Sequence, residues 1–225
     1  FLLMVVYRRQ PRRSVRLLRG GQSPSFESFH LFRSRPDASS SGLIALSSKR
    51  GGRDALYLMD SHRRREIRHF DFPILVAIND PSIAPGDSAV VFSAQDFGGR
   101  TDLYRVTWPG NRPRLERLTN DDYDDLEPDV SPDGQWVAFA SDRGTDGYDY
   151  ALFRLSLLTG AIETVSHPDS GDDRQPVYSP DGRWIAFRST RGGTSVLYVR
   201  PAGPPYEARR LTRLAGPALD PGWPA

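Results

Sequence analysis

Short apolar runs recur along the chain, and each is bounded by residues that favour turns. Residues 136–139 (Trp-Val-Ala-Phe) and 184–187 (Trp-Ile-Ala-Phe) are continuously apolar rather than alternating. Continuous runs of this length are typical of strands that are covered on both faces of their sheet. Gly, Pro, Asp and Ser cluster between the runs and predict tight turns. The pattern therefore predicts an all-β protein made of short strands.

The same pattern repeats with a nearly constant period. Residues 127–141 (EPDVSPDGQWVAFAS) and 175–189 (QPVYSPDGRWIAFRS) are near copies, and residues 80–93 are a more divergent third. The first turn residue of each repeat serves as a marker: Ala38, Ala84, Ser131 and Ser179, at steps of 46, 47 and 48 residues. A proline precedes the last three markers by three residues and returns at Pro221. A repeat of this kind indicates the fold more strongly than any single motif.

Each repeat holds four short extended runs. In the last repeat they cover about residues 176–178, 184–189, 196–200 and 208–212. Four short strands in a period of roughly 40–50 residues are typical of one blade of a β-propeller. The predicted fold is therefore an all-β propeller of about four complete four-stranded antiparallel blades, with partial blades at the termini. The complete blades are expected at about residues 38–72, 80–119, 127–166 and 175–212, and a further blade is expected to start at 217–225.

The N-terminal segment, residues 1–37, admits two interpretations. Residues 4–8 and 13–18 match the third and fourth strands of the last repeat, which would make them part of an earlier blade. The apolar start followed by arginines also fits the remnant of a membrane or signal segment, although a secretory signal carries its positive charge before the apolar run. Residues 20–42 are expected to hold a poor first strand and a loop. No apolar run approaches the 18 residues of a complete transmembrane helix.

The repeat resembles that of a known family. Residues 176–192 read Pro-x-Tyr-Ser-Pro-Asp-Gly-x-x-Ile-Ala-Phe-x-Ser-x-Arg-Gly, and Leu-Tyr and Arg-x-Leu-Thr follow at 197–198 and 209–212. This pattern resembles the WD40-like (PD40) repeat of TolB-type propellers, which also occurs in propeller domains of tricorn-like and prolyl-oligopeptidase-like proteases. The resemblance covers about residues 38–225 and implies a propeller in the periplasm or elsewhere outside the cytoplasm of a bacterium. Because one blade type serves many unrelated functions, it leaves the function open.

The charges are divided unevenly along the chain. Of 30 Lys+Arg and 28 Asp+Glu, residues 1–70 carry 15 basic and 5 acidic, so residues 71–225 carry 15 basic and 23 acidic. A basic half can indicate nucleic-acid binding. However, no aromatic residues that would stack on bases are interleaved with the arginine pairs at 8–9 and 12–13. We therefore expect no nucleic-acid partner, and membrane association only through residues 1–20.

Acidic loops gather at one end of the predicted propeller. Strand direction alternates within a blade, so the loops between blades share an end with the second-to-third hairpins, and the Ser-Pro-Asp-Gly turns lie at the other end. Asp125 and Asp173 hold the same repeat position, three residues before the proline, and are expected to face the mouth of the central channel. The candidate binding residues at this mouth are Asp122, Tyr123, Asp124, Asp125, Glu127, Arg143, Asp172, Asp173, Arg174 and Arg191.

These acids have two interpretations. Carboxylates that converge on a funnel can bind a basic peptide or a cation. Aspartates in solvated loops more commonly cap nearby backbone amides. The matched arginines Arg50, Arg143 and Arg191 are expected to pair with the acids across blades, or else to bind a partner's carboxylate. The aromatic residues at repeat positions such as Phe139 are expected in the core.

The chain contains little that could catalyse a reaction. It has no Gly-x-Ser-x-Gly motif and no cysteine, and its four histidines (His30, His62, His69 and His167) lack the spacing of a metal site. We therefore expect a non-catalytic scaffold that binds a protein or peptide, with a basic partner favoured, and no cofactor or metal. The alternative is the gating propeller of a prolyl-oligopeptidase- or tricorn-like serine protease, whose hydrolase domain would lie outside residues 1–225. A third interpretation is the external sensor domain of a kinase or regulator.

Overall fold

The described strands form four antiparallel sheets and one separate hairpin. The computed structural model describes residues 3–7, 14–19, 28–29, 34–108, 110, 112–144, 149–166, 171–204 and 207–212, the first three ranges by backbone alone. The hairpin joins β1 (Leu3–Tyr7) to β2 (Ser14–Arg19). Whether this hairpin belongs to an earlier blade or to a membrane segment stays a prediction, and the blade expected from residue 217 lies outside the described residues.

We number the four sheets blades 1 to 4. Blade 1 contains β3 (Ser28–Phe29), β4 (Asp37–Ala38), β5 (Leu43–Arg50), β6 (Arg53–Asp60) and β7 (Arg65–Asp71). Blade 2 contains β8 (Leu75–Ile83), β9 (Ala89–Asp96), β10 (Thr101–Thr107) and β11 (Arg114–Arg117). Blade 3 contains β12 (Asp125–Val130), β13 (Trp136–Ser141), β14 (Ala151–Ser156) and β15 (Ile162–Thr164). Blade 4 contains β16 (Asp173–Tyr178), β17 (Trp184–Ser189), β18 (Val196–Pro201) and β19 (Arg209–Arg210).

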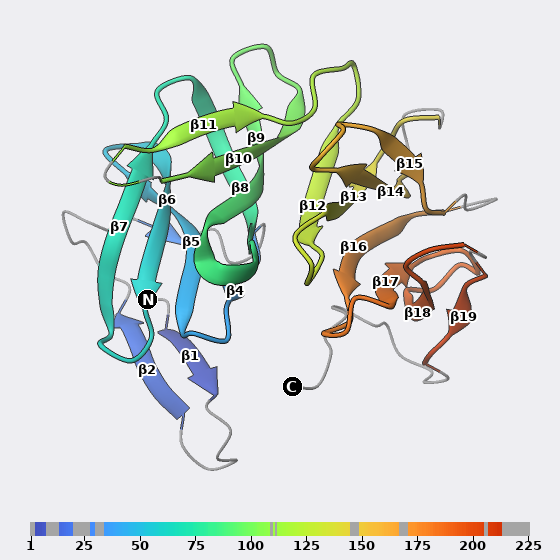
Figure 1. Cartoon of the computed structure of the whole chain (residues 1–225), viewed down its shortest axis with the longest axis horizontal. Helices are drawn as coiled ribbons and strands as arrows, with labels where there is room; N and C mark the ends of the chain where they lie inside the picture. Colours follow the sequence, from blue (N-terminus) through green and yellow to red (C-terminus); the bar gives the residue numbers. More distant parts are fainter. Residues whose placement is uncertain are drawn as a thin grey trace.

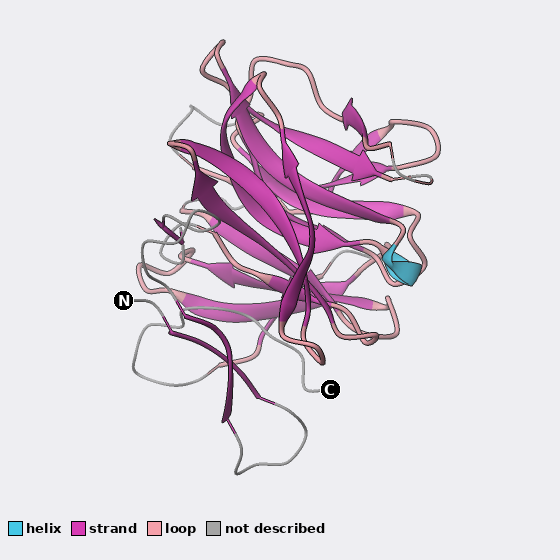
Figure 2. Cartoon of the chain, turned by 90° about the vertical axis from the view of Figure 1, so that its left-hand side faces the viewer, coloured by secondary structure: helices cyan, strands magenta, loops and turns pink. Residues whose placement is uncertain are grey.

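The blades stand side by side around a common centre. In Figure 1, β4, β8, β12 and β16 face this centre, and the later strands of each blade lie further out. Figure 2 shows strands almost throughout, with one helical turn, η1 (Pro85–Asp87). No helix in the described part of the chain is long and apolar enough to cross a membrane. The predicted fold class, an all-β propeller of four-stranded antiparallel blades, is confirmed.

Aromatic pairs fix the register of the second and third strands. Phe92 pairs with Tyr104 across β9 and β10, with ring centroids 6.1 Å apart. Phe139 pairs with Phe153 across β13 and β14, with ring centroids 6.0 Å apart. In blade 4, Phe187 and Tyr198 repeat the contact at 5.8 Å. Directly opposed aromatic residues stabilise an antiparallel pair, so the periodic aromatics belong to the core as predicted.

The core lies between the blades because each sheet is apolar on both faces. Val91 and Leu103 of blade 2 pack in one buried cluster with Val137 and Phe139 of blade 3. The other face of blade 3 packs in a further cluster with blade 4, which includes Ile185. This packing explains why the second strand of each repeat is apolar without interruption: neither of its faces meets water.

Hydrogen bonds at the centre also tie each blade to the next. The donor is the backbone N–H two residues after the recurring proline of one blade. The acceptor is the side-chain oxygen of the residue that follows the recurring proline in the preceding blade. Ile83 N donates to Asp37 Oδ2 (2.7 Å), Val130 N to Ser82 Oγ (3.0 Å) and Tyr178 N to Asp129 Oδ2 (2.7 Å). These contacts supply an acceptor for a buried backbone donor and set the spacing between inner strands.

The turn of blade 1 corrects the predicted marker Ala38. In blades 2 to 4 the turn is closed by backbone bonds from Asp87 N to Ala84 O, Gly134 N to Ser131 O and Gly182 N to Ser179 O. The equivalent bond in blade 1 runs from Gly42 N to Ser39 O, so Ser39 is the marker. The connection to β5 is one residue shorter than in the other blades, which shifts the alignment. Pro36 therefore takes the recurring proline position in blade 1.

We predict that Phe139→Ala lowers the free energy of unfolding by about 3–5 kcal/mol, because it removes a fully buried aromatic side chain between two blades. Urea denaturation followed by circular dichroism measures the change. The control is Leu158→Ala, since Leu158 is 89% exposed and its truncation should change the free energy by less than about 0.5 kcal/mol. Equal effects of the two substitutions would refute the register.

Candidate functional site

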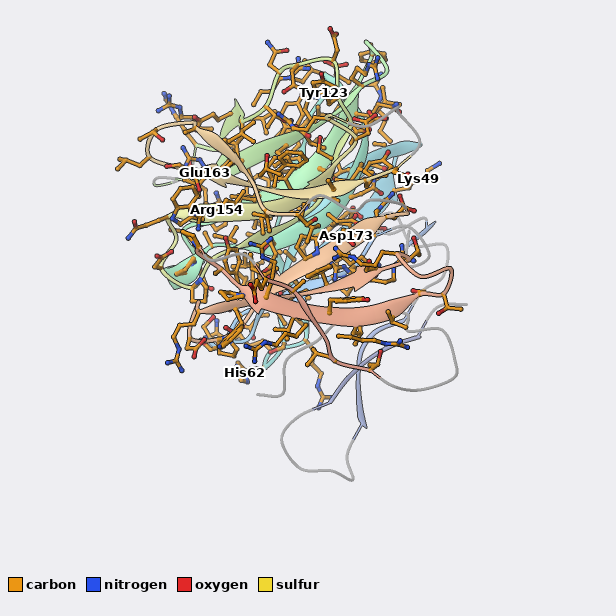
Figure 3. The ribbon with its side chains drawn as sticks, turned by 90° about the vertical axis from the view of Figure 1, so that its right-hand side faces the viewer. Lys49, His62, Tyr123, Arg154, Glu163 and Asp173 are labelled. Carbon is orange, nitrogen blue, oxygen red and sulfur yellow. The ribbon has the colours of Figure 1, made fainter. Side chains whose placement is uncertain are left out.

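The candidate residues lie at one end of the propeller, which we call the loop face. It comprises the connections between blades (residues 72–75, 118–124 and 171–172) and the hairpins between second and third strands (residues 50–53, 96–101, 141–144 and 189–195). In Figure 1 the connection from β7 to β8 and the hairpin from β9 to β10 lie at the top. The opposite end, the turn face, carries the turns that start at Ser39, Ala84, Ser131 and Ser179. Figure 3 shows Tyr123 of the loop face and His62 of the turn face at opposite ends of the molecule.

Asp125 is buried within blade 3 rather than exposed at a channel mouth. Its carboxylate accepts two hydrogen bonds from Nη2 of Arg143, at 2.7 and 2.8 Å, and has 0% exposure. Ser141, opposite Asp125 in the ladder, accepts a bond from Arg143 Nε at 3.0 Å. Burial raises the pKa of Asp125, and hydrogen bonds from Ser141 and Arg143 oppose that rise. The pair lies within one blade, so the expected pairing across blades is wrong here.

Asp173 repeats this arrangement in blade 4. It is also fully buried and forms an ion pair with Arg191 Nη2, while Ser189 accepts a hydrogen bond from Arg191 Nε at 3.0 Å. Breaking such a pair would leave a charge uncompensated in a buried position. The geometry of Asp125 and Asp173 therefore fits a structural role, and neither carboxylate is directed to the surface.

Each of these arginines covers the aromatic pair of its own blade. The guanidinium of Arg143 lies 5.3 Å from the ring centre of Phe153, and that of Arg191 lies 4.9 Å from Tyr198. Blade 2 has an aspartate, Asp96, at the matching hairpin position, and Arg117 from β11 lies over Tyr104 instead, at 5.9 Å. The loop-face end of each of these blades is thus closed by a cation over an aromatic ring.

Glu127 and Arg174 join blades 3 and 4. Arg174 Nε donates to Glu127 Oε2 at 3.2 Å, and the backbone N–H of Gln175 donates to the same oxygen at 2.8 Å. The Arg174 guanidinium also stacks 4.0 Å from the ring centre of Tyr150. The coulombic attraction and hydrogen bond of Glu127 raise the pKa of Arg174 against the effect of its burial. These residues link two inner strands and are fixed by the fold.

Asp124 and Asp172 cap backbone amides of neighbouring hairpins. Asp124 Oδ1 accepts from Thr101 N at 2.8 Å, and Asp172 Oδ1 accepts from Tyr150 N at 3.0 Å. Asp124 N in turn donates to Asp142 Oδ1 at 2.8 Å. The common role of loop aspartates, capping backbone amides, describes both residues.

Asp122 and Tyr123 are the candidate residues that the loop face presents to solvent. Both are exposed, Tyr123 at 40%, and the Tyr123 ring lies 5.4 Å from the Arg143 guanidinium. Tyr123 N donates to Asp121 Oδ1 at 3.1 Å, and Asp121 forms an ion pair with Arg143 at 3.1 Å. A short, tightly bonded loop thus carries an exposed aromatic residue and an exposed carboxylate.

The centre of the propeller holds a cavity that the sequence analysis did not assign to any function. Its volume is about 280 Å³, and it is lined by Arg35, Pro36, Asp37, Asp80, Pro81, Ser82, Pro128, Asp129 and Val177. These residues flank the recurring proline, whereas Asp125 and Asp173 lie three residues before it. Each repeat carries a proline flanked by residues of this cavity. Because the marker of blade 1 was predicted at the wrong residue, Pro36 and Asp37 were not aligned with their equivalents in the other repeats.

The carboxyl groups of this cavity hold protons more tightly than ordinary aspartates. Burial, opposed by the hydrogen bond from Arg35 N and reinforced by Glu127, raises the pKa of Asp80 to about 6. Burial, reinforced by the charge of Asp37, raises the pKa of Asp129 to about 7. Burial also raises the pKa of Asp37. Among the described residues, no group of three His, Cys, Asp or Glu side chains is placed to hold a metal ion.

A strained backbone conformation recurs at the residue before the proline in blades 2, 3 and 4. Asp80, Glu127 and Gln175 have φ values of 47°, 55° and 56°, in the left-handed region that non-glycine residues rarely adopt. Each lies in a bulge where the ladder skips the proline and the residue before it. Such strain persists only where surrounding contacts hold it, here the hydrogen bonds and ion pairs between inner strands.

The fold places the chain in the class of β-propellers, and several solved propellers share it. TolB from Acinetobacter baumannii matches at 23% identity with a TM-score of 0.63, over 79% of this chain and 42% of that chain. A putative TolB from Agrobacterium tumefaciens matches at 23% identity with a TM-score of 0.71, over 91% of this chain and 67% of that one. A puromycin-hydrolyzing peptidase of Mycobacterium tuberculosis matches at 15% identity with a TM-score of 0.60, over 90% of this chain and 31% of that one.

These similarities show a shared TolB-type propeller fold. No protein-family model matches the chain, so its assignment to the PD40 family stays a resemblance. The chain spans less than half of the Acinetobacter protein and about two thirds of the Agrobacterium one. Because the identities are low, activity and partners are matters for proposal.

We predict that Asp125→Ala lowers the free energy of unfolding by about 3 kcal/mol, because it removes the buried carboxylate that binds Arg143 and leaves this largely buried guanidinium with the partly exposed Asp121 as its carboxylate partner. Chemical denaturation provides the measurement. Asp122→Ala is the matched control, because it removes an exposed aspartate of the same loop and should change stability by less than about 0.5 kcal/mol. A near-neutral Asp125→Ala would show that this carboxylate is not structural.

We predict that stability falls as pH rises through the range in which Asp129 titrates. The folded state raises the pKa of Asp129 from 3.8 to about 7, so between these values the Asp129 carboxyl binds more protons in the folded protein than in the unfolded chain, and its contribution to stability falls as pH rises. Asp129→Asn keeps an acceptor for Tyr178 N and removes the charge. The variant should therefore gain stability over the native chain between pH 5 and pH 8 in urea denaturation. A difference between the two proteins that stays constant over this pH range would contradict the raised pKa.

Proposed function

We propose that this chain is a non-catalytic propeller that binds a protein partner on its loop face, through the loop that carries Asp122 and Tyr123. The observation that supports this proposal most directly is the number of bonds that hold that loop to its neighbours. Asp124 is bonded to a hairpin of blade 2 and a hairpin of blade 3, and Asp121 is bonded to Arg143. A loop held in this way loses little entropy when it binds, which favours affinity.

The chemistry of the loop indicates a basic partner. Tyrosine is enriched at the centres of protein interfaces because its ring offers apolar area and its hydroxyl a hydrogen bond. The adjacent carboxylate of Asp122 is exposed and can attract lysine or arginine, which increases the rate of association at low salt. Of the ten candidate residues, these two are the ones we assign to direct contact. The other eight hold the blades and loops in place.

The proposed setting is outside the cytoplasm of a bacterium. It rests on the resemblance of the repeat to TolB-type propellers and on the shared fold. The competing proposal, a gating propeller of a serine protease, requires a hydrolase domain beyond residue 225. A Gly-x-Ser-x-Gly motif within an α/β pattern in the complete reading frame would favour that role over the scaffold.

We predict that Tyr123→Ala weakens partner binding at least about fivefold, the loss of roughly 1 kcal/mol expected for an interface tyrosine. The partner is captured from an envelope extract with the immobilised chain, and its dissociation constant is then measured with purified components. Asp122→Asn should weaken binding less, and mainly at low salt. Leu158→Ala, exposed on the turn face beyond β14, should have no effect. Unchanged binding by both loop variants would refute the proposed surface.

A further inference from the structure

The loop face of blade 2 carries a hollow with exposed apolar walls. Its volume is about 310 Å³, and it is lined by Ile74, Asp96, Phe97, Gly98, Tyr104, Leu115 and Arg117. Phe97 is 76% exposed and Ile74 is 59% exposed. Large apolar side chains that gather around a hollow, rather than standing singly, commonly mark an interaction site.

Phe97 departs from the pattern of the other blades. It lies five residues after Phe92, and the residues five positions after Leu46, Phe139 and Phe187 are all glycine. These glycines are Gly51, Gly144 and Gly192. The hairpin geometry therefore does not require a side chain here, and the benzyl group of Phe97 is an addition specific to blade 2.

Asp96 also departs from the pattern of the other blades. It holds the hairpin position that Arg50, Arg143 and Arg191 hold in the other blades. In blade 3 the arginine from this position covers the ring of Phe153, whereas in blade 2 Tyr104 and Arg117 become part of the wall of a hollow. Blade 2 thus has a carboxylate where the other blades have an arginine, and the neighbouring Phe97 provides an apolar rim to the hollow.

The two exposed side chains stand on well-bonded turns. Asp96 Oδ1 accepts from Gly98 N at 2.7 Å, and Gly99 N donates to Asp96 O at 3.2 Å. On the other side, Leu75 N donates to Phe72 O at 2.9 Å and closes the turn that carries Ile74. The apolar walls are therefore supported from below by backbone and side-chain hydrogen bonds.

The charges of the wall favour a cation beside the apolar group. Arg117 is shared by two carboxylates, Asp96 at 3.3 Å and the buried Asp102, so the three groups together carry one negative charge. Thr101, which ends the same hairpin, is bonded to Asp124 of the loop that presents Asp122 and Tyr123. The hairpin that carries Phe97 is thus hydrogen-bonded to the loop proposed above to bind a basic partner.

We propose that this hollow seats one bulky apolar side chain that is flanked by arginine or lysine in the partner protein. The proposal rests on the proposed protein-binding function and specifies its anchor. A volume of about 310 Å³ is at the lower end for small-molecule pockets, which suits a single large side chain. The adjacent negative charge selects the basic flanking residues.

Three capped tripeptides test the proposal without a known partner: Ac-Arg-Trp-Arg-NH2, Ac-Arg-Ala-Arg-NH2 and Ac-Glu-Trp-Glu-NH2. Each is titrated into the 15N-labelled chain and followed by amide chemical shifts. We expect the first peptide to shift the amides around Ile74, Phe97 and Leu115, with a dissociation constant at least fivefold below those of the other two. Equal affinities for the first and third peptides, or shifts centred on another part of the chain, would overturn the proposal.

Phe97→Gly is the decisive variant, because glycine is the residue of the other three blades and the hairpin should fold. It should raise the dissociation constant of the Arg-Trp-Arg peptide at least fivefold. Leu158→Ala, which removes a side chain that is 89% exposed, should leave that constant unchanged. Retained affinity in Phe97→Gly would overturn the proposal. Concentration-dependent dimerisation of the native chain that Phe97→Gly abolishes would assign the hollow to a second copy, and would also overturn it.

The same variant separates this proposal from the function on which it rests. If Tyr123→Ala weakens binding of the captured partner and Phe97→Gly does not, the hollow is not the anchor, while the loop face remains the binding surface. If neither variant changes capture, both proposals fail. If both variants weaken it, the anchor and the surface are supported together.

Discussion

The structure depends on the way in which one inner strand bonds to the next. No strand ladder joins the described blades, so their association requires apolar faces and an additional polar contact near the axis. The residue after the recurring proline supplies that contact in blades 1 to 3: Asp37, Ser82 and Asp129 each accept a hydrogen bond from a backbone N–H of the following blade. The proline itself has no N–H, so the free inner edge of the strand is not left with a buried donor.

This arrangement brings carboxylates together at the centre of the molecule. Asp37 and Asp129 cap the neighbouring strands, and the bulge before each proline turns Asp80 and Glu127 toward the same region. Burial in a shared cavity then raises the pKa of Asp80 and Asp129 toward neutrality. On the loop face, by contrast, the buried carboxylates are paired with cations: Asp125 and Asp173 are neutralised by arginines of their own blades. Asp122, Tyr123 and the hollow of blade 2 are exposed on this face.

The blades, their strands and the core aromatics could be predicted because they follow from a periodic pattern. The site was harder for a physical reason. Asp125 begins the inner strand β12 and ends a run of acidic residues that reads as a solvated loop in the sequence. Only the hairpin that carries Arg143 back to Asp125 places this carboxylate in a buried ion pair. Asp37 was not predicted because the turn of blade 1 is one residue shorter than its equivalents, which shifted the alignment of that repeat. The hollow at Phe97 is recognised only when the hairpin of blade 2 is compared with those of the other three blades.

The sequence by itself determined the repeat, the four-stranded blade and the Ser-Pro-Asp-Gly turns. Turn chemistry and strand burial are local properties, and each repeat encodes them in its own residues. The tertiary structure alone decided which charged residues face one another. The partner of a carboxylate is set by sheet register and by the packing of adjacent blades, at separations of 18 residues for Asp125 with Arg143 and 47 for Glu127 with Arg174. For that reason, residues with the same character in the sequence became members of buried ion pairs, acids of the central cavity or exposed side chains.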